Sequence, residues 1–515
     1  MKVLLINPTF SAIFPSDYGR PALYEPLGLA YLAAALREAG HEPAILDCVA
    51  EGWRVRQRDG EFTRIGLTDL QILERVRKAK PEVIGVTSEF TGFERDSLRI
   101  AALVKEAMPS IPVLFGGADA TARASEFIAN ANVDLVIRGE GEQTLCRVVD
   151  YFQKHSRLPL DFPGTSAKGQ HNPPAEEIAN VDEIPMPARD LLRMDIYLED
   201  QTPLMPYAKR RPIGFMISSR GCPYNCVFCS TTKIWRRWRA RSAEKVVDEI
   251  AFLVKTYGVR EIAFQDDSFM VDPDRVRRIC EEIIRRKLNI SWSVPPGIQA
   301  NRLSDELLRV MKKSGFYRAC FPIESGDPEL LEWIRKPVDF EEVETAIKLC
   351  HRHGIWTYGN FIIGFPRQSA DSIEKTLQYA INCQLDMINV YIAQPYAGSD
   401  LYQEFVDLGL LDPERAQAST VFDSKYNTVH FTAQELCAKR QELLKLFLRK
   451  RLFRLITPRG IWQVIKKLNS PEKFAYAFRV VSRLAGASLH AGYVNLFGSH
   501  VDKPEEILFV EDKHT

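Results

Sequence analysis

The chain has 515 residues, of which 45% are hydrophobic and 26% charged; this composition is typical of globular proteins, and the length requires more than one domain. Its 68 lysine and arginine residues balance 67 aspartate and glutamate residues, which excludes an overall field that recruits nucleic acid. No stretch approaches the ~18 to 20 uninterrupted apolar residues of a membrane span, and the apolar start at residues 3–6 is too short for a secretion signal. We therefore expect a cytoplasmic protein.

Residues 1–150 alternate short apolar runs with amphipathic helices. The expected strands are Lys2–Asn7, Glu42–Asp47, Glu82–Thr87, Pro112–Gly116 and Asp134–Arg138, and the expected helices are Leu27–Ala39, Arg95–Glu106 and Ala124–Asn130. This alternation predicts a doubly wound, Rossmann-like parallel sheet, which binds ligands outside the carboxyl ends of its strands. At those ends the sequence has small or polar residues that let a ligand approach the backbone. They are Asn7, Thr87, Ser88, Gly116, Gly117, Gly139, Glu140 and Gly141.

A second α/β series covers residues 211–400, after a proline-rich stretch at 151–210 that lacks periodicity and predicts an ordered linker. The expected strands are Ile213–Ser219, Glu261–Gln265, Ser291–Val294, Arg318–Ile323, Thr357–Ile363 and Met387–Ile392, and the helices between them are Ala243–Thr256, Pro273–Arg286, Asp305–Lys313, Glu341–His353 and Ser369–Asn382. Six such repeats predict an open or partial (β/α)6 barrel with its site at the carboxyl ends of the strands. Residues 401–515 are expected to be mostly helical, with a long helix at Gln434–Leu455 and shorter ones after Pro458 and Pro471.

Three of the ten cysteines cluster directly after the first strand of the second series. Cys222, Cys226 and Cys229 have the spacing C-x3-C-x2-C on a loop, and thiolate is the soft ligand that iron prefers. Three thiolates on a cubane [4Fe-4S] cluster leave one iron open for a substrate or cofactor. The alternatives are a zinc site or three unrelated cysteines, but structural zinc takes four ligands, usually in two separated pairs.

This motif, with Phe228 before the last cysteine, resembles the signature of the radical S-adenosylmethionine (SAM) superfamily. The resemblance implies that the amino and carboxylate groups of SAM chelate the open iron. It further implies that an electron cleaves SAM and that the 5′-deoxyadenosyl radical takes a hydrogen atom from the substrate. The three cysteines then bind metal and have no acid–base role, and the resemblance identifies no acid–base residue.

Three later segments resemble the same superfamily in the same order, namely Ile262–Phe269, Phe321–Gly326 and Asn360–Pro366. The resemblance implies SAM contacts at Phe228, Asp267, Glu324, Ser325 and Gly364. Pro322 stands where the family often has glycine, which leaves the strand geometry open at that position. For Asp266 and Asp267, a helix-capping turn is the alternative interpretation.

The order of doubly wound domain, linker, radical SAM domain and helical region resembles the cobalamin-binding subclass of the superfamily. Segments Pro26–Leu36, Gly116–Thr121 and Arg138–Glu142 carry this resemblance. Many cobalamin domains ligate cobalt through the histidine of a D-x-H-x-x-G motif, whereas this chain has Asp47-Cys48-Val49-Ala50-Glu51-Gly52. The resemblance therefore implies a cobalamin without a protein histidine ligand, which contacts Val49 and the strand-end residues named above. Asp119 also stands where relatives often have histidine, and a nucleotide-type domain that binds nothing is the alternative.

Two basic segments have alternative interpretations. Arg236, Arg237, Arg239 and Arg241 are interleaved with Trp235 and Trp238, a pattern found in nucleic-acid sites. The superfamily usually has W-R-x-R-S here, however, which favours packing within the domain or an anionic substrate, and we expect no nucleic-acid partner. The helix with Lys445, Arg449, Lys450, Arg451 and Arg454 allows contact with a membrane surface, but a solvated charged face is the commoner explanation.

The leading functional hypothesis is methyl transfer to an unactivated carbon, in which one SAM molecule methylates cobalt(I) cobalamin and another generates the radical. The alternative is an oxidative cyclisation, because the chain also resembles the anaerobic magnesium-protoporphyrin monomethyl ester cyclase, or another cobalamin-dependent radical rearrangement. A non-catalytic corrinoid or iron–sulfur sensor is the third hypothesis. The expected partners are a small-molecule or lipid-like substrate and an electron donor such as flavodoxin or ferredoxin. No motif in residues 401–515 identifies the substrate.

Overall fold

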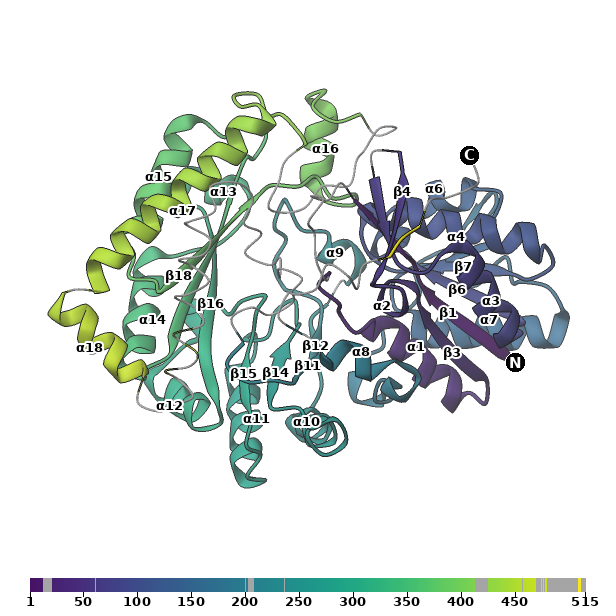
Figure 1. The fold of residues 1–515 in the computed structure, drawn as a ribbon, viewed down its shortest axis with the longest axis horizontal. Coiled ribbons are helices and arrows are strands. Elements are labelled where there is room, and N and C mark those ends of the chain that lie inside the picture. The colour runs from purple at the N-terminus through teal and green to yellow at the C-terminus, as the bar shows by residue number, and fades with distance from the viewer. Residues whose placement is uncertain are drawn as a thin grey trace. The chain divides into compact units, whose positions relative to one another are not determined.

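The computed structural model describes residues 1–12, 21–60, 62–199, 201, 208–235, 237–412, 425–455, 457–468, 474, 476, 478 and 508–510. The chain forms two compact units, whose elements are labelled in Figure 1. Unit 1 comprises Met1–Met205, Lys233–Trp235 and Phe497–Thr515, and unit 2 comprises Pro206–Thr232 and Arg236–Leu496. Arg236 and most of the helix predicted after Pro471 lie outside the described residues.

Unit 1 is built on a seven-stranded sheet with the order β10-β9-β8-β7-β6-β1-β3. The parallel strands are β1 (Lys2–Asn7), β3 (Glu42–Asp47), β6 (Val83–Thr87), β7 (Val113–Gly116) and β8 (Leu135–Ile137). An antiparallel edge follows, formed by β9 (Thr165–Ala167) and β10 (Gln170–His171). The five parallel strands are those that the sequence predicts. The strand order reverses between β1 and β6, and a doubly wound sheet binds its ligand at such a switch point.

Helices cover both faces of this sheet, because successive strand residues face opposite sides. Val3 and Leu5 pack on one face, and Leu4 and Ile6 pack on the other. The first face is covered by α1 (Leu27–Glu38) and α7 (Gly141–His155). The second is covered by α3 (Asp69–Ala79), α4 (Glu94–Ala107), α5 (Ala118–Ala122) and α6 (Ala124–Ala129). Unit 1 also contains two short helical turns, which are α2 (Cys48–Glu51) and η1 (Thr91–Phe93).

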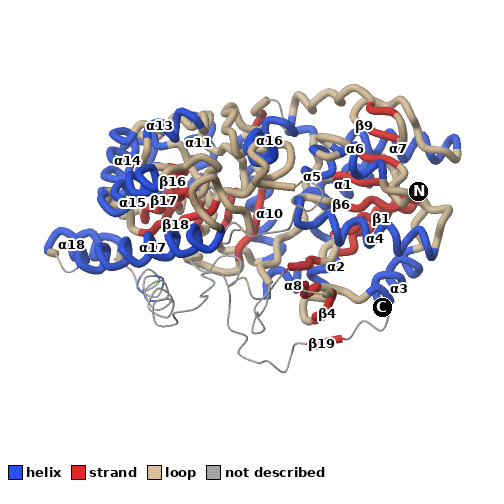
Figure 2. The backbone as a smooth tube through the Cα atoms, turned by 90° about the horizontal axis from the view of Figure 1, so that it is seen from above, coloured by secondary structure: helices blue, strands red, loops and turns tan. Residues whose placement is uncertain are grey.

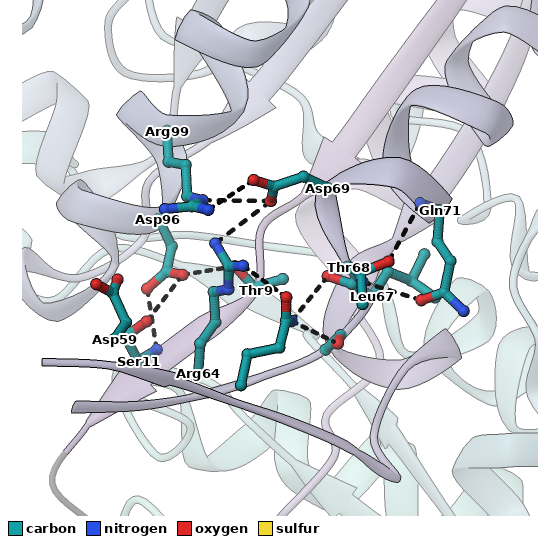
Figure 3. A network of polar contacts seen from close by, with 12 residues as sticks. Thr9, Ser11, Asp59, Arg64, Leu67, Thr68, Asp69, Gln71, Asp96 and Arg99 are labelled. Atoms are coloured by element: carbon teal, nitrogen blue, oxygen red, sulfur yellow. Dashed lines mark hydrogen bonds and ion pairs between the residues drawn. The ribbon is translucent and has the colours of Figure 1, made fainter. Parts of the chain in front are cut away.

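A second, four-stranded sheet in unit 1 lies outside the sequence prediction. Its strands are, in order, β19 (Leu508–Val510), β4 (Val55–Asp59), β5 (Phe62–Ile65) and β2 (Phe10–Ala12). A buried polar network joins this sheet to α3 and α4, as Figure 3 shows. Asp96 accepts hydrogen bonds from Thr9 Oγ1 at 2.5 Å and from Ser11 N at 2.9 Å, and Arg64 lies 3.3 Å from Asp69. These strands bury polar side chains, such as Arg56, Gln57 and Arg64, as well as the apolar side chains of Val55 and Ile65, and the buried polar groups require hydrogen-bond partners.

The range 151–210, for which the sequence predicts a linker, is partly built into unit 1. β9 and β10 belong to its sheet, and they are followed by η2 (Val181–Glu183), η3 (Arg189–Leu191) and α8 (Met194–Glu199). The buried side chains of Arg189 and Glu25 form an ion pair at 2.8 Å. This pair ties the proline-rich stretch to the residues that precede α1.

Unit 2 is built on a six-stranded parallel sheet whose strands follow one another in chain order. They are β11 (Ile213–Met216), β14 (Glu261–Phe264), β15 (Ser291–Ser293), β16 (Phe316–Glu324), β17 (Trp356–Ile363) and β18 (Met387–Ile392). The longer helices between them are α10 (Ala243–Tyr257), α11 (Pro273–Arg285), α12 (Asp305–Lys313), α14 (Phe340–Arg352) and α15 (Ala370–Asn382). Alternate strand residues, such as Phe321 and Ile323, form one large core with these helices. The remaining short elements are β12 (Ser219–Arg220), β13 (Arg239–Ala240), η4 (Ala300–Arg302), α13 (Pro328–Trp333), α16 (Asp400–Asp407) and α9 (Thr231–Ile234), whose last two residues belong to unit 1.

The last described helices of unit 2 are α17 (Ala433–Leu455) and α18 (Pro458–Lys467). Figures 1 and 2 both show α17 on the outside of the unit, next to α15. Asp386, just before β18, is buried and pairs with Arg451 of α17 at 2.5 Å and with Lys467 of α18. A buried carboxylate requires such partners, so the cluster fixes both helices against the sheet. Among the described residues, no helix combines the length and apolar character that a membrane crossing requires.

Candidate functional site

The three clustered cysteines lie on the loop that follows β12 in unit 2. All ten cysteines of the chain are free thiols, and the Cys226 side chain is buried while those of Cys222 and Cys229 are half-buried. Burial raises the pKa of Cys226 to about 11, against the opposing charge of Lys336, and it also raises the pKa of Cys222. Metal binding at these thiols therefore requires the release of protons.

The three thiols of this loop are the soft ligands that the iron atoms of an iron–sulfur cluster take. In the part of the chain that the structure describes, no three His, Cys, Asp or Glu side chains are arranged to hold one metal ion. Zinc needs ligands that converge on a single atom, whereas the thiolates of a cluster bind different iron atoms and stay apart. Cys222, Cys226 and Cys229 are nevertheless close enough for the charges of these thiols to act on one another.

Asp266, at the carboxyl end of β14, holds the start of the cysteine loop. Its buried carboxylate accepts hydrogen bonds from Ser218 N at 2.8 Å, Ser218 Oγ at 2.6 Å and Ser219 Oγ at 2.5 Å. Arg275 of α11 donates to the carbonyl of Ser218 at 2.7 Å. Asp266 is thus a structural residue of the loop and does not cap a helix, contrary to the alternative interpretation above.

Asp267 is placed differently from its neighbour, because Asp267 is exposed whereas Asp266 is buried. The protein around it displaces water and Asp266 lies beside it, which together raise the pKa of Asp267 to about 6. Hydrogen bonds from Gly221 N and from the Thr231 hydroxyl oppose this rise. The predicted SAM-binding residue Asp267 therefore lies against the cysteine loop, and its charge acts on Cys222.

Residues 237–242, which belong to the arginine- and tryptophan-containing segment after the cysteines, pack within unit 2. β13 pairs with β12 at the entrance to the loop, and Trp238 Nε1 donates to the carbonyl of Ser268 at 2.8 Å. Arg241 forms an ion pair with the buried Glu249, and the Ser242 hydroxyl caps α10. These contacts favour the interpretation of this segment as domain packing.

The far side of the cysteine loop is docked on α13 and the residues after it. Val227 N donates to the carbonyl of Ile334 at 3.1 Å, and Leu401 N donates to the carbonyl of Val227 at 2.9 Å. Phe228 lies next to Phe365, with 6.1 Å between the ring centroids. The loop is therefore held at both ends by bonds to the surrounding protein.

Glu324 and Lys336 form a buried ion pair beside the cysteines, at a distance of 3.2 Å between Nζ and Oε1. Glu324 has a φ of 66°, and the register with β17 shifts between Pro322 and Glu324. Proline has no N–H to donate to the neighbouring strand, so the strand is irregular where the family often has glycine. Sequence reasoning missed Lys336, because it lies in no recognised motif and is brought to the site by the turn after α13.

Two other predicted SAM residues are engaged by the fold itself. The Ser325 hydroxyl lies 2.9 Å from the Thr376 hydroxyl and accepts a hydrogen bond from Asp327 N at 3.0 Å. Gly364 has a φ of 84°, and a Cβ at this position would lie 3.0 Å from Leu436 of α17. The backbone N–H groups are engaged as well, since Ser325 N donates to the carbonyl of Ile323 at 2.8 Å and Gly364 N donates to Gln368 Oε1 at 2.7 Å.

The predicted ligand-facing residues of unit 1 lie at the switch point of its sheet. Asn7 ends β1 and Thr87 ends β6, on either side of the point where the strand order reverses. Gly117 follows β7 with a φ of 104°, and a Cβ there would lie 2.4 Å from the carbonyl oxygen of Ser88. Only glycine fits this position, whereas Gly116 has no neighbour closer than 3.7 Å to an added Cβ.

The motif that lacks histidine forms the turn from β3 into α2. Asp47 accepts hydrogen bonds from Ala50 N at 2.9 Å and from the Tyr197 hydroxyl at 2.6 Å, and Asn7 also bonds to its carboxylate. Val49 lies on α2 and is half-buried. Asp47 thus has a structural role in the turn. Val49 places an isopropyl group at the position where the family motif has the imidazole of histidine.

Asp119 and Glu140 also have partners within unit 1. Asp119 accepts a hydrogen bond from Ser88 Oγ at 3.0 Å and pairs with Arg123 at 2.7 Å, so it orients Ser88. Glu140 accepts a hydrogen bond from Ile178 N at 2.7 Å. Gly139 and Gly141 flank Glu140. Gly139 has a φ of 75° and open space around an added Cβ, whereas a Cβ on Gly141 would lie 2.8 Å from Leu32.

Two family models match the chain. The Radical SAM superfamily model matches residues 216–380, and the B12 binding domain model matches residues 20–149. The first range contains the cysteine loop and the Glu324–Lys336 pair, and the second contains most of the sheet of unit 1.

Curated relatives match over most of their length. An uncharacterized methyltransferase of Pyrococcus horikoshii is 32% identical over 88% of this chain and 94% of its own. The cytidylyl-2-hydroxyethylphosphonate methyltransferase of Streptomyces wedmorensis is 31% identical over 81% of this chain and 83% of its own. The anaerobic magnesium-protoporphyrin IX monomethyl ester cyclase of Rubrivivax gelatinosus is 27% identical over 86% of this chain and 75% of its own.

Solved structures share the fold. The radical SAM methyltransferase TsrM from Kitasatospora setae, with tryptophan and a SAM analogue, aligns with a TM-score of 0.62 and 18% identity over 89% of each chain. The cobalamin-dependent SAM radical enzyme OxsB, with aqua-cobalamin and SAM, aligns with a TM-score of 0.65 and 17% identity over 94% of this chain and 71% of that one. Together with the relatives above 30% identity, these matches establish that the chain belongs to the radical SAM enzymes that carry a B12-binding domain, the family of the methyltransferases that it matches.

Proposed function

We propose that the protein transfers a methyl group to an unactivated carbon of a small-molecule substrate, with a [4Fe-4S] cluster, SAM and cobalamin as cofactors. The observation that carries this proposal is the match with two methyltransferases over 81% and 88% of this chain. When bound, the cluster supplies the electron that splits SAM, and the cobalamin carries the methyl group. An electron donor such as flavodoxin or ferredoxin would reduce the protein.

Unit 2 supplies the residues for radical generation. Cys222, Cys226 and Cys229 would hold the cluster, since three thiolates on one loop would bind three of its irons and leave one iron free. Glu324 and Asp267 are the polar side chains placed beside these thiols, where they would bind the polar groups of SAM. Phe228 would exclude water, and Ser325 and Gly364 would contribute backbone groups.

Unit 1 supplies the residues for the methyl carrier. Asn7, Thr87 and Ser88 would contact cobalamin at the switch point, with Gly116, Gly117, Gly139, Glu140 and Gly141 at the neighbouring strand ends. Val49 offers no nitrogen to cobalt. A cobalamin without an imidazole ligand has a weaker axial field, which eases its reduction and the release of its methyl group.

Anaerobic reconstitution with iron, sulfide and hydroxocobalamin tests the proposal. We expect a cluster and a corrinoid that both remain with the protein through gel filtration. The reduced protein should form 5′-deoxyadenosine when it is given SAM. When a substrate is added as well, it should also form S-adenosylhomocysteine and a methylated product. The Cys222→Ala, Cys226→Ala and Cys229→Ala variants should lose iron loading and SAM cleavage. Cys146→Ala, a half-buried cysteine of unit 1, is the matched control, and normal iron loading in all four variants would refute the cluster assignment.

Oxidative cyclisation is the second candidate function, because the cyclase relative is 27% identical over 86% of this chain. The two functions differ in their products. A cyclase would insert oxygen from water and form no S-adenosylhomocysteine, so incubation in ¹⁸O-labelled water followed by mass spectrometry separates them. A sensor, the third hypothesis, would form no 5′-deoxyadenosine at all.

A further inference from the structure

Large apolar side chains are exposed in one short region of unit 2. The described residues contain fourteen exposed large hydrophobic side chains, and seven of them lie between residues 452 and 478. These seven are Leu452, Phe453, Ile461, Trp462, Ile465, Phe474 and Phe478. A concentration of this kind marks an interaction site rather than ordinary surface.

Helix α18 turns its apolar residues outward and a lysine inward. Lys467 is 1% exposed and pairs with Asp386, and Gly460 is also buried. Ile461, Trp462 and Ile465 are 47%, 59% and 54% exposed. Because the buried ion pair fixes the rotation of the helix, its apolar face cannot turn into the core of unit 2.

Basic side chains accompany this apolar face. Residues 443–471 contain no aspartate or glutamate, and their lysine and arginine residues are Lys445, Arg449, Lys450, Arg451, Arg454, Arg459, Lys466 and Lys467. Several of these are used internally, since Arg451 and Lys467 pair with Asp386 and Arg454 donates to backbone carbonyls. Lys445, Arg449, Lys450 and Lys466 remain exposed, and Lys466 Nζ lies 5.6 Å from the centre of the Trp462 ring.

We propose that α17 and α18 form a docking surface for an anionic phospholipid bilayer. Exposed isoleucine, tryptophan and phenylalanine side chains enter the boundary between headgroups and acyl chains, and the lysines and arginines beside them attract anionic headgroups. A second copy of this chain suits the face less well, because a symmetric contact would set basic residues against basic residues. For the basic residues of α17 the sequence alone favours a solvated charged face, and the exposed apolar side chains of α18 are the reason to propose membrane contact instead. The proposal is independent of the reaction that the enzyme catalyses.

Sedimentation with vesicles tests the proposal on the full-length protein. We expect binding to vesicles of phosphatidylcholine mixed with phosphatidylglycerol, weaker binding to phosphatidylcholine alone, and loss of binding at high salt. Lys466→Gln should weaken the partition coefficient about fivefold, the effect of one basic residue near the surface. The double variant Ile461→Ser with Ile465→Ser should weaken it more than about tenfold.

Leu70→Ser is the matched control, because Leu70 of α3 in unit 1 is 74% exposed and lies outside the proposed surface. It should bind vesicles like the wild type. Circular dichroism and cluster content verify that each variant is folded. Failure of the wild type to bind the anionic vesicles would overturn the proposal. So would light scattering that shows a dimer which the Ile461→Ser with Ile465→Ser variant dissolves, because a second copy would then cover the face.

Discussion

Lys336 Nζ lies 3.2 Å from Glu324 Oε1, and this pair forms beside the thiol of Cys226. Burial alone would lower the pKa of Lys336, but the charges of Glu324 and Cys226 raise it overall. The lysine therefore remains positively charged next to sulfur ligands that must become negative. Its charge lowers the cost of forming thiolates in a buried site.

Lys336→Met should make the cluster harder to reduce, because a positive charge next to it stabilises the reduced, more negative state. We expect the midpoint potential, measured by electron paramagnetic resonance in a redox titration, to fall by tens of millivolts. Lys348→Met is the control, since this lysine of α14 is exposed and pairs only with Glu344 on its own helix. Equal potentials in the wild type and Lys336→Met would contradict the electrostatic role.

Asp266→Asn should loosen the cysteine loop. The amide is neutral and retains one acceptor oxygen where the carboxylate has two, so either Ser218 N or the hydroxyls of Ser218 and Ser219 would face an NH2 group in place of an acceptor. A buried polar group without a partner costs about 1–3 kcal/mol. We expect a lower thermal midpoint and incomplete iron loading. Glu281→Gln on the exposed face of α11 should change neither quantity, and full iron loading in Asp266→Asn would argue against a role in holding the loop.

The Asp386 cluster should make the stability of unit 2 sensitive to acid. Burial raises the pKa of Asp386, but Lys467 and Arg451 outweigh it and hold the pKa below its ordinary value. A carboxyl whose pKa is lower in the folded protein contributes stability above its unfolded value of about 3.9 and loses it as the pH falls below that value. Thermal midpoints measured between pH 7 and pH 3 should therefore drop steeply at the acid end.

Asp386→Asn should remove this acid sensitivity and destabilise the protein at neutral pH. Removing one partner of a buried ion pair costs about 3–5 kcal/mol, because Lys467 stays buried without its counter-charge. Asp371→Asn, in which an exposed aspartate of α15 loses its pair with Lys375, should shift the midpoint little. A pH profile identical to that of the wild type in Asp386→Asn would show that other groups control acid unfolding.

Val49→His should add a nitrogen ligand to the bound corrinoid. The side chain lies on α2 at the position of the histidine in the D-x-H-x-x-G motif, and it is half-buried. We expect nitrogen superhyperfine splitting in the electron paramagnetic resonance spectrum of the cobalt(II) form, which the wild type should lack, together with slower methyl transfer. Glu51→His, on the same short helix, is the control. Splitting in the wild type would mean that another nitrogen coordinates cobalt.

The sequence predicts the parallel strands of both units well, because these strands are apolar runs bounded by turn residues. β1 and β18 have the predicted bounds, Lys2–Asn7 and Met387–Ile392. The β4–β5 hairpin is missed because it buries the polar Arg56, Gln57 and Arg64 as well as Val55 and Ile65, so its strands lack a regular alternation of apolar and polar residues. Arg64 bonds to Gln57 at 2.6 Å. Short-range patterns detect burial in an apolar core and overlook burial in a polar one.

The residues of the candidate site likewise differ in whether the sequence predicts them. The cysteines are predicted from their spacing because the ligands lie in one short segment. The sequence does not predict Lys336, because its position beside Cys226 results from the packing of the loop against the turn after α13. Ser325 and Gly364 match a family motif, but only the structure reveals that Thr376 and Leu436 are their neighbours. Motifs thus locate the site, and long-range packing determines which side chains are available in it.

The cysteine loop is anchored by Asp266 at its start and by Ile334 and Leu401 near Cys226. The donors and acceptors of these bonds are all protein groups, so the polypeptide itself can supply them. If oxygen removes iron from the site, we expect a folded apoprotein whose three thiols stay on an anchored loop. A cell could then restore such an enzyme by delivering a new cluster, without synthesising the protein again.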